Sequence, residues 1–178
     1  MFGESHEPRT SEPAERAAPA AVRVHIGERL RSNIEDLLGR YVTRLRTDAL
    51  TQAAKPLARP LLEDHAMSFL GDVFQTLVIL EKAKDIGAEE EYALLKDGTE
   101  IQRLIGGLHG RQRHRLGWTE KGLQREYDII IEEVGAHARR SVSDERVLAW
   151  AVDILNRQLE RAREASLAEF RSAARESG

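Results

Sequence analysis

The stretch DGTEIQRLIGGLHGRQRHRLGWTEKGLQREY, residues 97–127, decides the fold that we expect for this chain. Its first half is rich in glycine and arginine, and a corner at Gly117-Trp118 leads into a second amphipathic run that begins near Thr119. No carboxylate lies between residues 101 and 119, although that span contains four arginines and two histidines: Arg103, Arg111, Arg113, Arg115, His109 and His114. This concentration of positive charge favours contact with anions or with carboxylates of a partner.

The same stretch predicts a turn followed by two helices. Asp97-Gly98 is a turn signal, and Thr99 with Gln102 three residues later fits a capping box that starts a helix. Thr119 can cap the next helix. Three glycines each weaken the first helix by up to roughly 1 kcal/mol relative to alanine. We therefore expect close backbone contact or bending to compensate at Gly106, Gly107 and Gly110.

Apolar residues at steps of three and four predict further helices on both sides of this stretch. The segment 60–87 is the most apolar, so it should lie centrally with neighbours on several sides, and Gly87 should end it. The others are a first helix from Val24 to about Leu50, a helix after Thr119, and a last helix that Ser143 caps and that continues to about Arg175.

The last of these helices is the longest. Some thirty residues would make it roughly 45 Å long, which is more than a compact bundle needs, so its end can protrude. No segment shows the alternation of a strand. We expect an all-α fold, a bundle of about five helices with a long C-terminal helix.

Length and composition predict one folded domain behind a polar tail. The chain has 178 residues, of which 41% are hydrophobic, enough for a single core. Residues 1–21 contain three of the five prolines and no apolar core. They are therefore predicted to be a disordered tail and not a signal peptide, followed by one domain at 22–178.

Charge and missing motifs exclude several function classes. The net charge of -3 and the pI near 6.1 argue against non-specific coating of nucleic acid or membrane, and no run of about eighteen apolar residues is present. The absence of cysteine excludes disulfides, thiolate metal sites and a cysteine nucleophile. Phosphate loops, His-Glu-x-x-His, serine elbows and the Glu-x-x-His pairs of di-metal bundles are also missing. We expect a cytoplasmic protein that is not an enzyme and needs no metal.

Several residues of the central stretch are candidates for a pocket. His109 lies one turn before Arg113, and Trp118 and Glu126 can reach back to them if the two helices pack antiparallel. In the alternative interpretation these residues only pack, with Trp118 as an apolar anchor whose indole N–H bonds a backbone carbonyl. Three further arginines suit either a partner protein or the ion pairs of a solvated face: Arg103, Arg111 and Arg115.

A second group of polar residues accompanies the most apolar segment: Asp64, His65, Asp72 and Gln75. A chelating arrangement would need ligands from other helices, because these positions share one helix face only loosely. His65 is better explained as a buried cap or as the partner in an interhelical hydrogen bond.

Three stretches together resemble a known family: LEDHAMSFLGDVFQTLV at 62–78, the segment 97–118, and LQREYDIIIEEV at 123–134. They are similar to the RsbRD-type N-terminal helical sensor domain, the input region of bacterial stress-response regulators and of many sensor histidine kinases. The resemblance covers nearly all of the chain after the tail and implies a fold like the non-haem globin-like domains of stressosome proteins. It marks a candidate sensing or packing centre: Asp64, His65, Phe69, Asp72, Gln75, His109, Gly110, Arg113, Gly117, Trp118 and Glu126.

The resemblance implies a non-catalytic signal-input module without a cofactor. The resembling proteins continue into an output module, whereas this sequence ends at Gly178. We therefore expect a homodimer formed by the last helix, with the first helix as a second candidate, and a separate partner such as a histidine kinase or stress-response kinase. A piece of a longer protein is the other interpretation.

Two alternatives stay open. The first is a haem- or small-ligand-binding globin-like sensor, with His65 or His109 as axial ligand. The second is nucleic-acid binding by residues 103–115, which ranks lower because the chain is acidic and only 5% aromatic.

Overall fold

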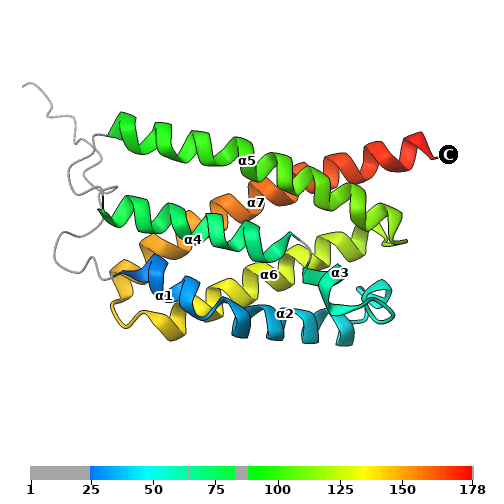
Figure 1. The fold of residues 1–178 in the computed structure, drawn as a ribbon, viewed down its shortest axis with the longest axis horizontal. Helices are drawn as coiled ribbons and strands as arrows, with labels where there is room; N and C mark the ends of the chain where they lie inside the picture. The colour runs from blue at the N-terminus through cyan, green and yellow to red at the C-terminus, as the bar shows by residue number, and fades with distance from the viewer. Residues whose placement is uncertain (1–24, 64, 83–87, 178) are drawn as a thin grey trace, which may run out of the picture.

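The computed structural model describes residues 25–63, 65–82 and 88–177, and all regular structure within them is helical (Figure 1). The elements in chain order are α1 (Ile26–Ser32), α2 (Ile34–Thr47), the 3-10 turn η1 (Gln52–Ala54), α3 (Arg59–Glu63), α4 (Ala66–Lys82), α5 (Ala88–Arg115), α6 (Glu120–Ser141) and α7 (Glu145–Glu176). The prediction of an all-α bundle with a long C-terminal helix is confirmed.

Each of the first two predicted helices is divided in two. Asn33 interrupts the first with φ -116° and ψ 22°, and its side-chain amide donates to the carbonyl of Arg29 (3.3 Å). Such a local bond offers the backbone an alternative to the helix ladder. The predicted segment 60–87 corresponds to α3 and α4. The predicted N-terminal tail and the stop at Gly87 lie outside the described residues.

The predicted turn at Asp97-Gly98 and the predicted helix start at Thr99 are wrong. α5 begins at Ala88 and runs through these positions without a break for 28 residues. Helix stability in proteins comes mostly from tertiary packing, and α5 packs extensively on α7. That packing outweighs the cost of a glycine inside the helix, which is about 1 kcal/mol.

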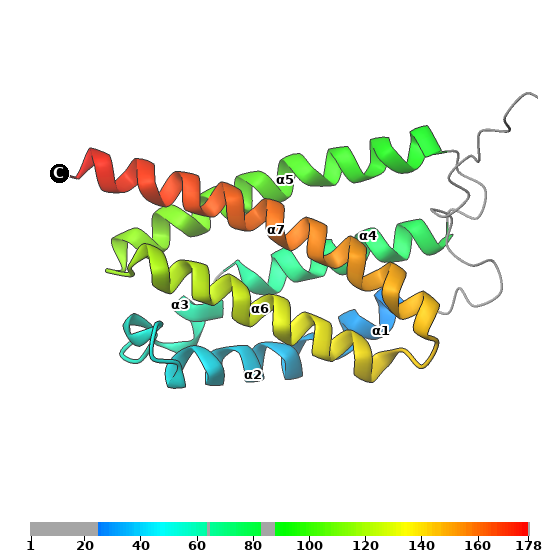
Figure 2. The same cartoon turned by 180° about the vertical axis from the view of Figure 1, so that it is seen from behind.

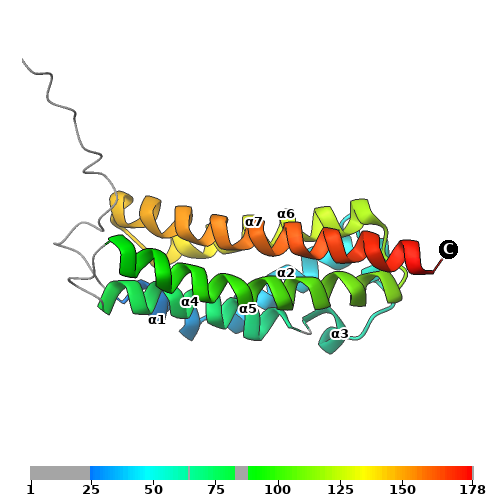
Figure 3. The ribbon, with the colours of Figure 1, turned by 90° about the horizontal axis from the view of Figure 1, so that it is seen from above.

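Helices α5 and α7 run in the same direction and cross (Figures 2 and 3). Small residues of both helices meet at the crossing. A Cβ atom on Gly106 would lie 2.7 Å from the carbonyl oxygen of Ala162, and one on Gly110 would lie 2.0 Å from that of Ser166. No methyl group fits at either distance. Of the two compensations expected, close backbone contact is therefore found at Gly106 and Gly110, whereas Gly107 faces the side chain of Glu169.

The C-terminal helix is packed for most of its length, and only its end, residues 174–177, is continuously exposed and extends beyond the other helices (Figure 1). Its apolar stripe is buried inside the chain from Val147 as far as Phe170, against α5, α6 and α4. The predicted cap at Ser143 is off by one residue, because the carboxylate of Asp144 accepts the backbone N–H groups of Arg146 (2.9 Å) and Val147 (3.1 Å). A carboxylate also complements the positive end of the helix dipole.

The predicted corner between α5 and α6 is confirmed in detail. Gly117 has φ 76°, the N–H of Trp118 donates to the carbonyl of Arg113 (3.0 Å), and the N–H of Gly117 donates to that of His114 (3.0 Å). This pair of bonds is the Schellman ending of a helix. Thr119 caps α6 by accepting a backbone N–H one turn later (3.0 Å). The corner places the last turns of α5 beside the first turns of α6.

Helix α4 occupies the central position predicted for it. It contacts α1, α2, α5 and α7. At its C-terminal end, the carboxylate of Glu81 accepts the backbone N–H of Ile26 at 2.7 Å and so caps the start of α1. The polar site described next lies near the other end of α4.

Candidate functional site

A buried ion pair joins the end of α5 to the start of α6. The guanidinium of Arg113 and the carboxylate of Glu126 meet through Nη2 and Oε1 at 2.8 Å and through Nε and Oε2 at 3.0 Å. The two residues are 0% and 1% exposed. A pair so far from water is tolerated only when its remaining hydrogen-bonding groups are also satisfied.

Arg113 satisfies all five of its N–H donors. Besides the bonds to the carboxylate, Nη1 donates to the carbonyl of Leu61 (2.9 Å) and to the side chain of Gln112 (3.0 Å), and Nη2 donates to the carbonyl of Leu62 (2.9 Å). Leu61 and Leu62 belong to the last turn of α3, where helical carbonyls lack intrahelical partners. The arginine therefore connects α3 to the end of α5 by hydrogen bonds.

Trp118 covers this arginine from the corner. The ring centroid lies 4.9 Å from Cζ of Arg113, within the range of a cation–π contact, and the residue is 4% exposed. The expected role as an apolar anchor is confirmed. The expected bond to a backbone carbonyl is not found, because Nε1 is buried without a partner among the described residues.

Glu126 receives two further hydrogen bonds, from α2 and α5. The hydroxyl of Tyr41 donates to Oε1 at 2.5 Å, and Nε2 of His109 lies 3.1 Å from Oε2. Burial alone would raise the pKa of Glu126, but the charge of Arg113 and the contact with His109 hold it well below its usual range. Burial and the neighbouring carboxylate raise the pKa of Tyr41. The site therefore holds an ionised carboxylate and a neutral phenol.

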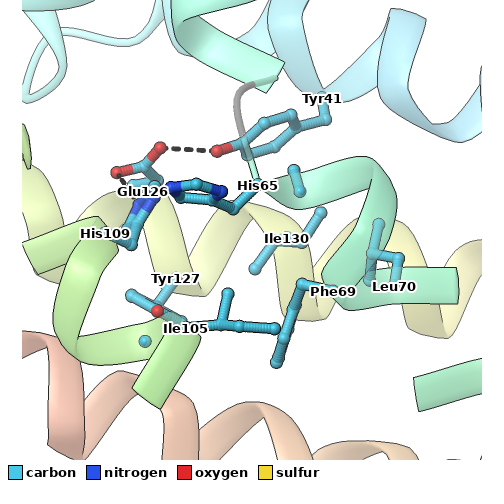
Figure 4. A pocket seen from close by; sticks show the side chains of 11 residues that line it. Tyr41, His65, Phe69, Leu70, Ile105, His109, Glu126, Tyr127 and Ile130 are labelled. Atoms are coloured by element: carbon cyan, nitrogen blue, oxygen red, sulfur yellow. Dashed lines mark hydrogen bonds and ion pairs between the residues drawn. The ribbon is translucent and has the colours of Figure 1, made fainter. Parts of the chain in front are cut away.

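A small cavity of about 40 Å³ lies directly beside this cluster (Figure 4). Its polar end contains Tyr41, His65, His109 and Glu126, and the rest of the wall is mostly apolar: Ala66, Phe69, Leu70, Ile105, Gly106, Tyr127 and Ile130. One water molecule needs about 10–15 Å³ on this measure, so the cavity admits a ligand of a few heavy atoms. Drug-sized ligands occupy pockets of roughly 300–1,000 Å³, so haem would require the helices to move apart.

The structure brings together most of the predicted centre. His65, His109 and Glu126 line the cavity, whereas Arg113 and Trp118 belong to the cluster beside it and do not line it. Two predicted members lie elsewhere, since Asp72 is exposed on α4 and Gln75 accepts a bond from Arg31 (2.5 Å) on the surface. Asp64 lies outside the described residues.

The predicted partner-binding arginines lie on the outer surface of α5. Arg103 pairs with Glu100 (3.2 Å), Arg111 pairs with Glu169 (2.6 Å), and Arg115 is exposed. Both pairs fit the interpretation as a solvated face, and binding of a partner stays a prediction.

Sequence reasoning missed the contributors from distant segments. Tyr41 lies within the first predicted helix and was not among the candidate site residues, although a buried tyrosine usually needs a partner for its hydroxyl. The α3 carbonyls have no sequence signature at all. Among the described residues, no group of three histidine, aspartate or glutamate side chains is placed to hold a metal ion. None of the described helices is both long and apolar enough to span a bilayer.

Comparisons of the chain with family models, with curated proteins and with solved structures give no match. The resemblance to RsbRD-type sensor domains and the implied likeness to globins therefore stay predictions.

Proposed function

We propose that the chain is a non-catalytic cytoplasmic signal-input module of bacterial stress or two-component signalling, which acts by dimerisation and partner docking. One observation carries this proposal. The titratable side chains of the site are bonded to one another around a small cavity, and together they connect α2, α3, α5 and α6.

The bonding within the cluster argues against catalysis. A general base works best with a pKa near the operating pH and with a lone pair free for the proton it takes. Glu126 has a depressed pKa, and both of its oxygens already accept bonds from Tyr41, His109 and Arg113. Such a carboxylate serves positioning better than proton transfer.

The cavity supplies a route for an input. A molecule that enters it would contact Ile105 and His109 on α5 together with residues of α4 and α6. Packed interiors respond to such a change by shifting between discrete arrangements and do not deform smoothly. Since α5 contacts α7 through backbone at Gly106 and Gly110, a shift of α5 would move the C-terminal helix as well.

The test joins the full chain through its C-terminal helix to the catalytic core of a histidine kinase and measures autophosphorylation. Ala66→Leu fills the cavity and should change the rate several-fold. Ser68→Leu is the matched control, because it adds the same side chain to an exposed position of the same helix, and it should leave the rate unchanged. Equal rates for wild type and both variants, with identical helical content, would refute the input role.

The second candidate is a small-ligand sensor, and the mixed lining of the cavity favours it. Two histidines and a tyrosine hydroxyl at one end, with apolar walls elsewhere, suit a small and weakly polar molecule. We expect xenon to shift the NMR signals of Ile105 and Ile130, and Ala66→Leu to abolish the shift. If the ligand is haem, a Soret band should appear when haem is added to the purified protein.

A further inference from the structure

Helix α5 carries a stripe of exposed apolar residues on its outer face. Ile101, Leu104 and Leu108 are 57%, 65% and 48% exposed. Their spacing of three and four residues places them on one side of the helix, away from the glycines that contact α7. In Figure 1, α5 lies along the edge of the bundle, which agrees with the exposure of these three residues. Large apolar residues grouped in this way mark an interaction surface more often than scattered ones do.

Charge changes sign along the same helix. The exposed acidic residues Glu89 and Glu90 precede the stripe, and the exposed Arg115 follows it. Glu100 and Arg111 also flank the stripe, but each is already paired within the chain, with Arg103 (3.2 Å) and with Glu169 (2.6 Å). By helical spacing, Glu90 and Arg115 lie in line with the stripe at its two ends. The outer face therefore passes from acidic through apolar to basic.

We propose that this face of α5 binds the same face of a second copy of the chain, with the two helices antiparallel and the two-fold axis near Leu104. This inference rests on the dimerisation in the proposed function and names the surface responsible. Antiparallel packing sets Ile101 of one copy beside Leu108 of the other and places the acidic half of each helix near the basic half of its partner. Parallel packing would bring like charges together, which is destabilising.

The C-terminal helix, which we expected to form the dimer, is less suited to it. Its apolar stripe from Val147 to Phe170 is already buried within the chain. The outer face of α5 has no such cover among the described residues. A two-fold interface is self-complementary by construction, which the charge pattern of this face satisfies.

The small size of the stripe predicts a weak dimer. Standard interfaces use about 20–30 residues on each side, whereas here three large apolar residues and their charged flanks make the contact. We expect association that depends on protein concentration and weakens with added salt, because the flanking charges are exposed and screened.

Single cysteines test the geometry without background, because the chain has no cysteine of its own. Ile101→Cys and Leu108→Cys are prepared with tags of different size and oxidised separately and as an equal mixture. The antiparallel arrangement predicts that the mixed 101–108 disulfide forms at least five times faster than either homodimer disulfide. Leu104→Cys, next to the axis, should cross-link with itself, and Ser68→Cys, exposed on α4, should cross-link only at the rate of random collision.

A second variant measures the affinity. Leu104→Glu should raise the dimer dissociation constant at least tenfold in sedimentation equilibrium, while the helical content stays the same. Faster 101–101 and 108–108 disulfides would overturn the antiparallel arrangement. A dimer that survives Leu104→Glu would overturn this surface and leave dimerisation itself intact.

Two further outcomes separate this inference from the proposed function. A wild-type protein that stays monomeric at all concentrations overturns the dimer in both, whereas the cavity-filling kinase test still decides the input role on its own. The other outcome is a monomer in which removal of residues 1–24 speeds chemical labelling of the thiol in Leu104→Cys. This result would assign the face to the chain's own N-terminal segment and would also overturn the proposal.

Discussion

The two faces of α5 show opposite distributions of charge and apolar surface. The inner face near its end buries Arg113 completely, whereas the outer face leaves Leu104 65% exposed. Charged residues are almost never fully buried unless they are paired, and on the inner face every donor of the arginine has a partner. On the outer face the leucine contacts no core.

The inner face of α5 therefore stabilises the fold, whereas its outer face remains available to a partner. The inner face is fixed by a network in which the loss of one member leaves a buried charge. The outer face contributes little to the stability of a single copy, so it is free to serve association. Substitutions on the two faces should therefore differ sharply in their effect on stability.

Breaking the inner ion pair should have the largest effect. Arg113→Met leaves the Glu126 carboxylate buried without its cation, and we expect the free energy of unfolding to fall by about 3–5 kcal/mol in urea titrations. The double variant Arg113→Met/Glu126→Leu should recover part of this loss, because it removes the unpaired charge.

The matched control for this variant is an exposed arginine of the same helix. Arg103→Met removes an exposed arginine that pairs with Glu100 on the same helix, and it should change stability by no more than about 0.5 kcal/mol. Similar losses for Arg113→Met and Arg103→Met would contradict the contrast between the faces.

The glycine contact should come next. A methyl group on Gly110 would lie 2.0 Å from a carbonyl oxygen of α7, so Gly110→Ala should destabilise by about 1–3 kcal/mol in thermal or urea unfolding. Gly71→Ala in α4 meets no atom within 4 Å and should be neutral or stabilise by up to about 1 kcal/mol. Equal effects at the two sites would show that α5 and α7 can move apart cheaply.

Adjacent residues on the two faces offer a narrower comparison. Ile105→Ala opens the cavity wall and should cost about 2 kcal/mol. Leu104→Ala should cost less than about 0.5 kcal/mol when the protein is dilute enough to be monomeric. A large loss for the leucine at low concentration would mean that the outer face is covered within one copy.

The dependence of the unfolding free energy on pH should reveal the buried carboxylate on the inner face. The pKa of Glu126 is held below its ordinary value of 4.5, so its stabilising effect is complete above about pH 4.5 and is lost as the pH falls toward the folded-state value. One such group contributes up to about 1.4 kcal/mol per pH unit. Between pH 5 and pH 3, Glu126→Gln should show a shallower decline in urea stability than wild type. Parallel declines for the two proteins would contradict the assignment.

Short sequence patterns predicted correctly those parts of the fold that hydrogen bonds between nearby residues determine. The corner at Gly117 and the cap at Thr119 depend on hydrogen bonds within five residues, and both were predicted correctly. The glycines at 106, 107 and 110 indicated close backbone contact or bending, and the structure shows the contact at Gly106 and Gly110. The partner on α7 could not be named, since it lies more than fifty residues away.

Local signals failed where tertiary packing decides. Asp97-Gly98 is a turn by composition, but α5 continues through it because of its contact with α7. The site shows the same limit. The sequence suggested that His109, Arg113 and Glu126 meet, because one short corner joins them, whereas Tyr41 and the α3 carbonyls enter from segments without any pattern that points to the cluster.

Helix α3 has only five residues, which is too short to persist alone in water. Its last carbonyls accept the two Nη groups of Arg113, so its existence is conditional on a side chain from another helix. Backbone amides of α3 should therefore exchange with deuterium in step with opening of the cluster, as one cooperative unit with a free energy below that of global unfolding. When Arg113 loses these hydrogen bonds, we expect α3 to unfold locally and the part of the cavity wall that carries His65 to open with it.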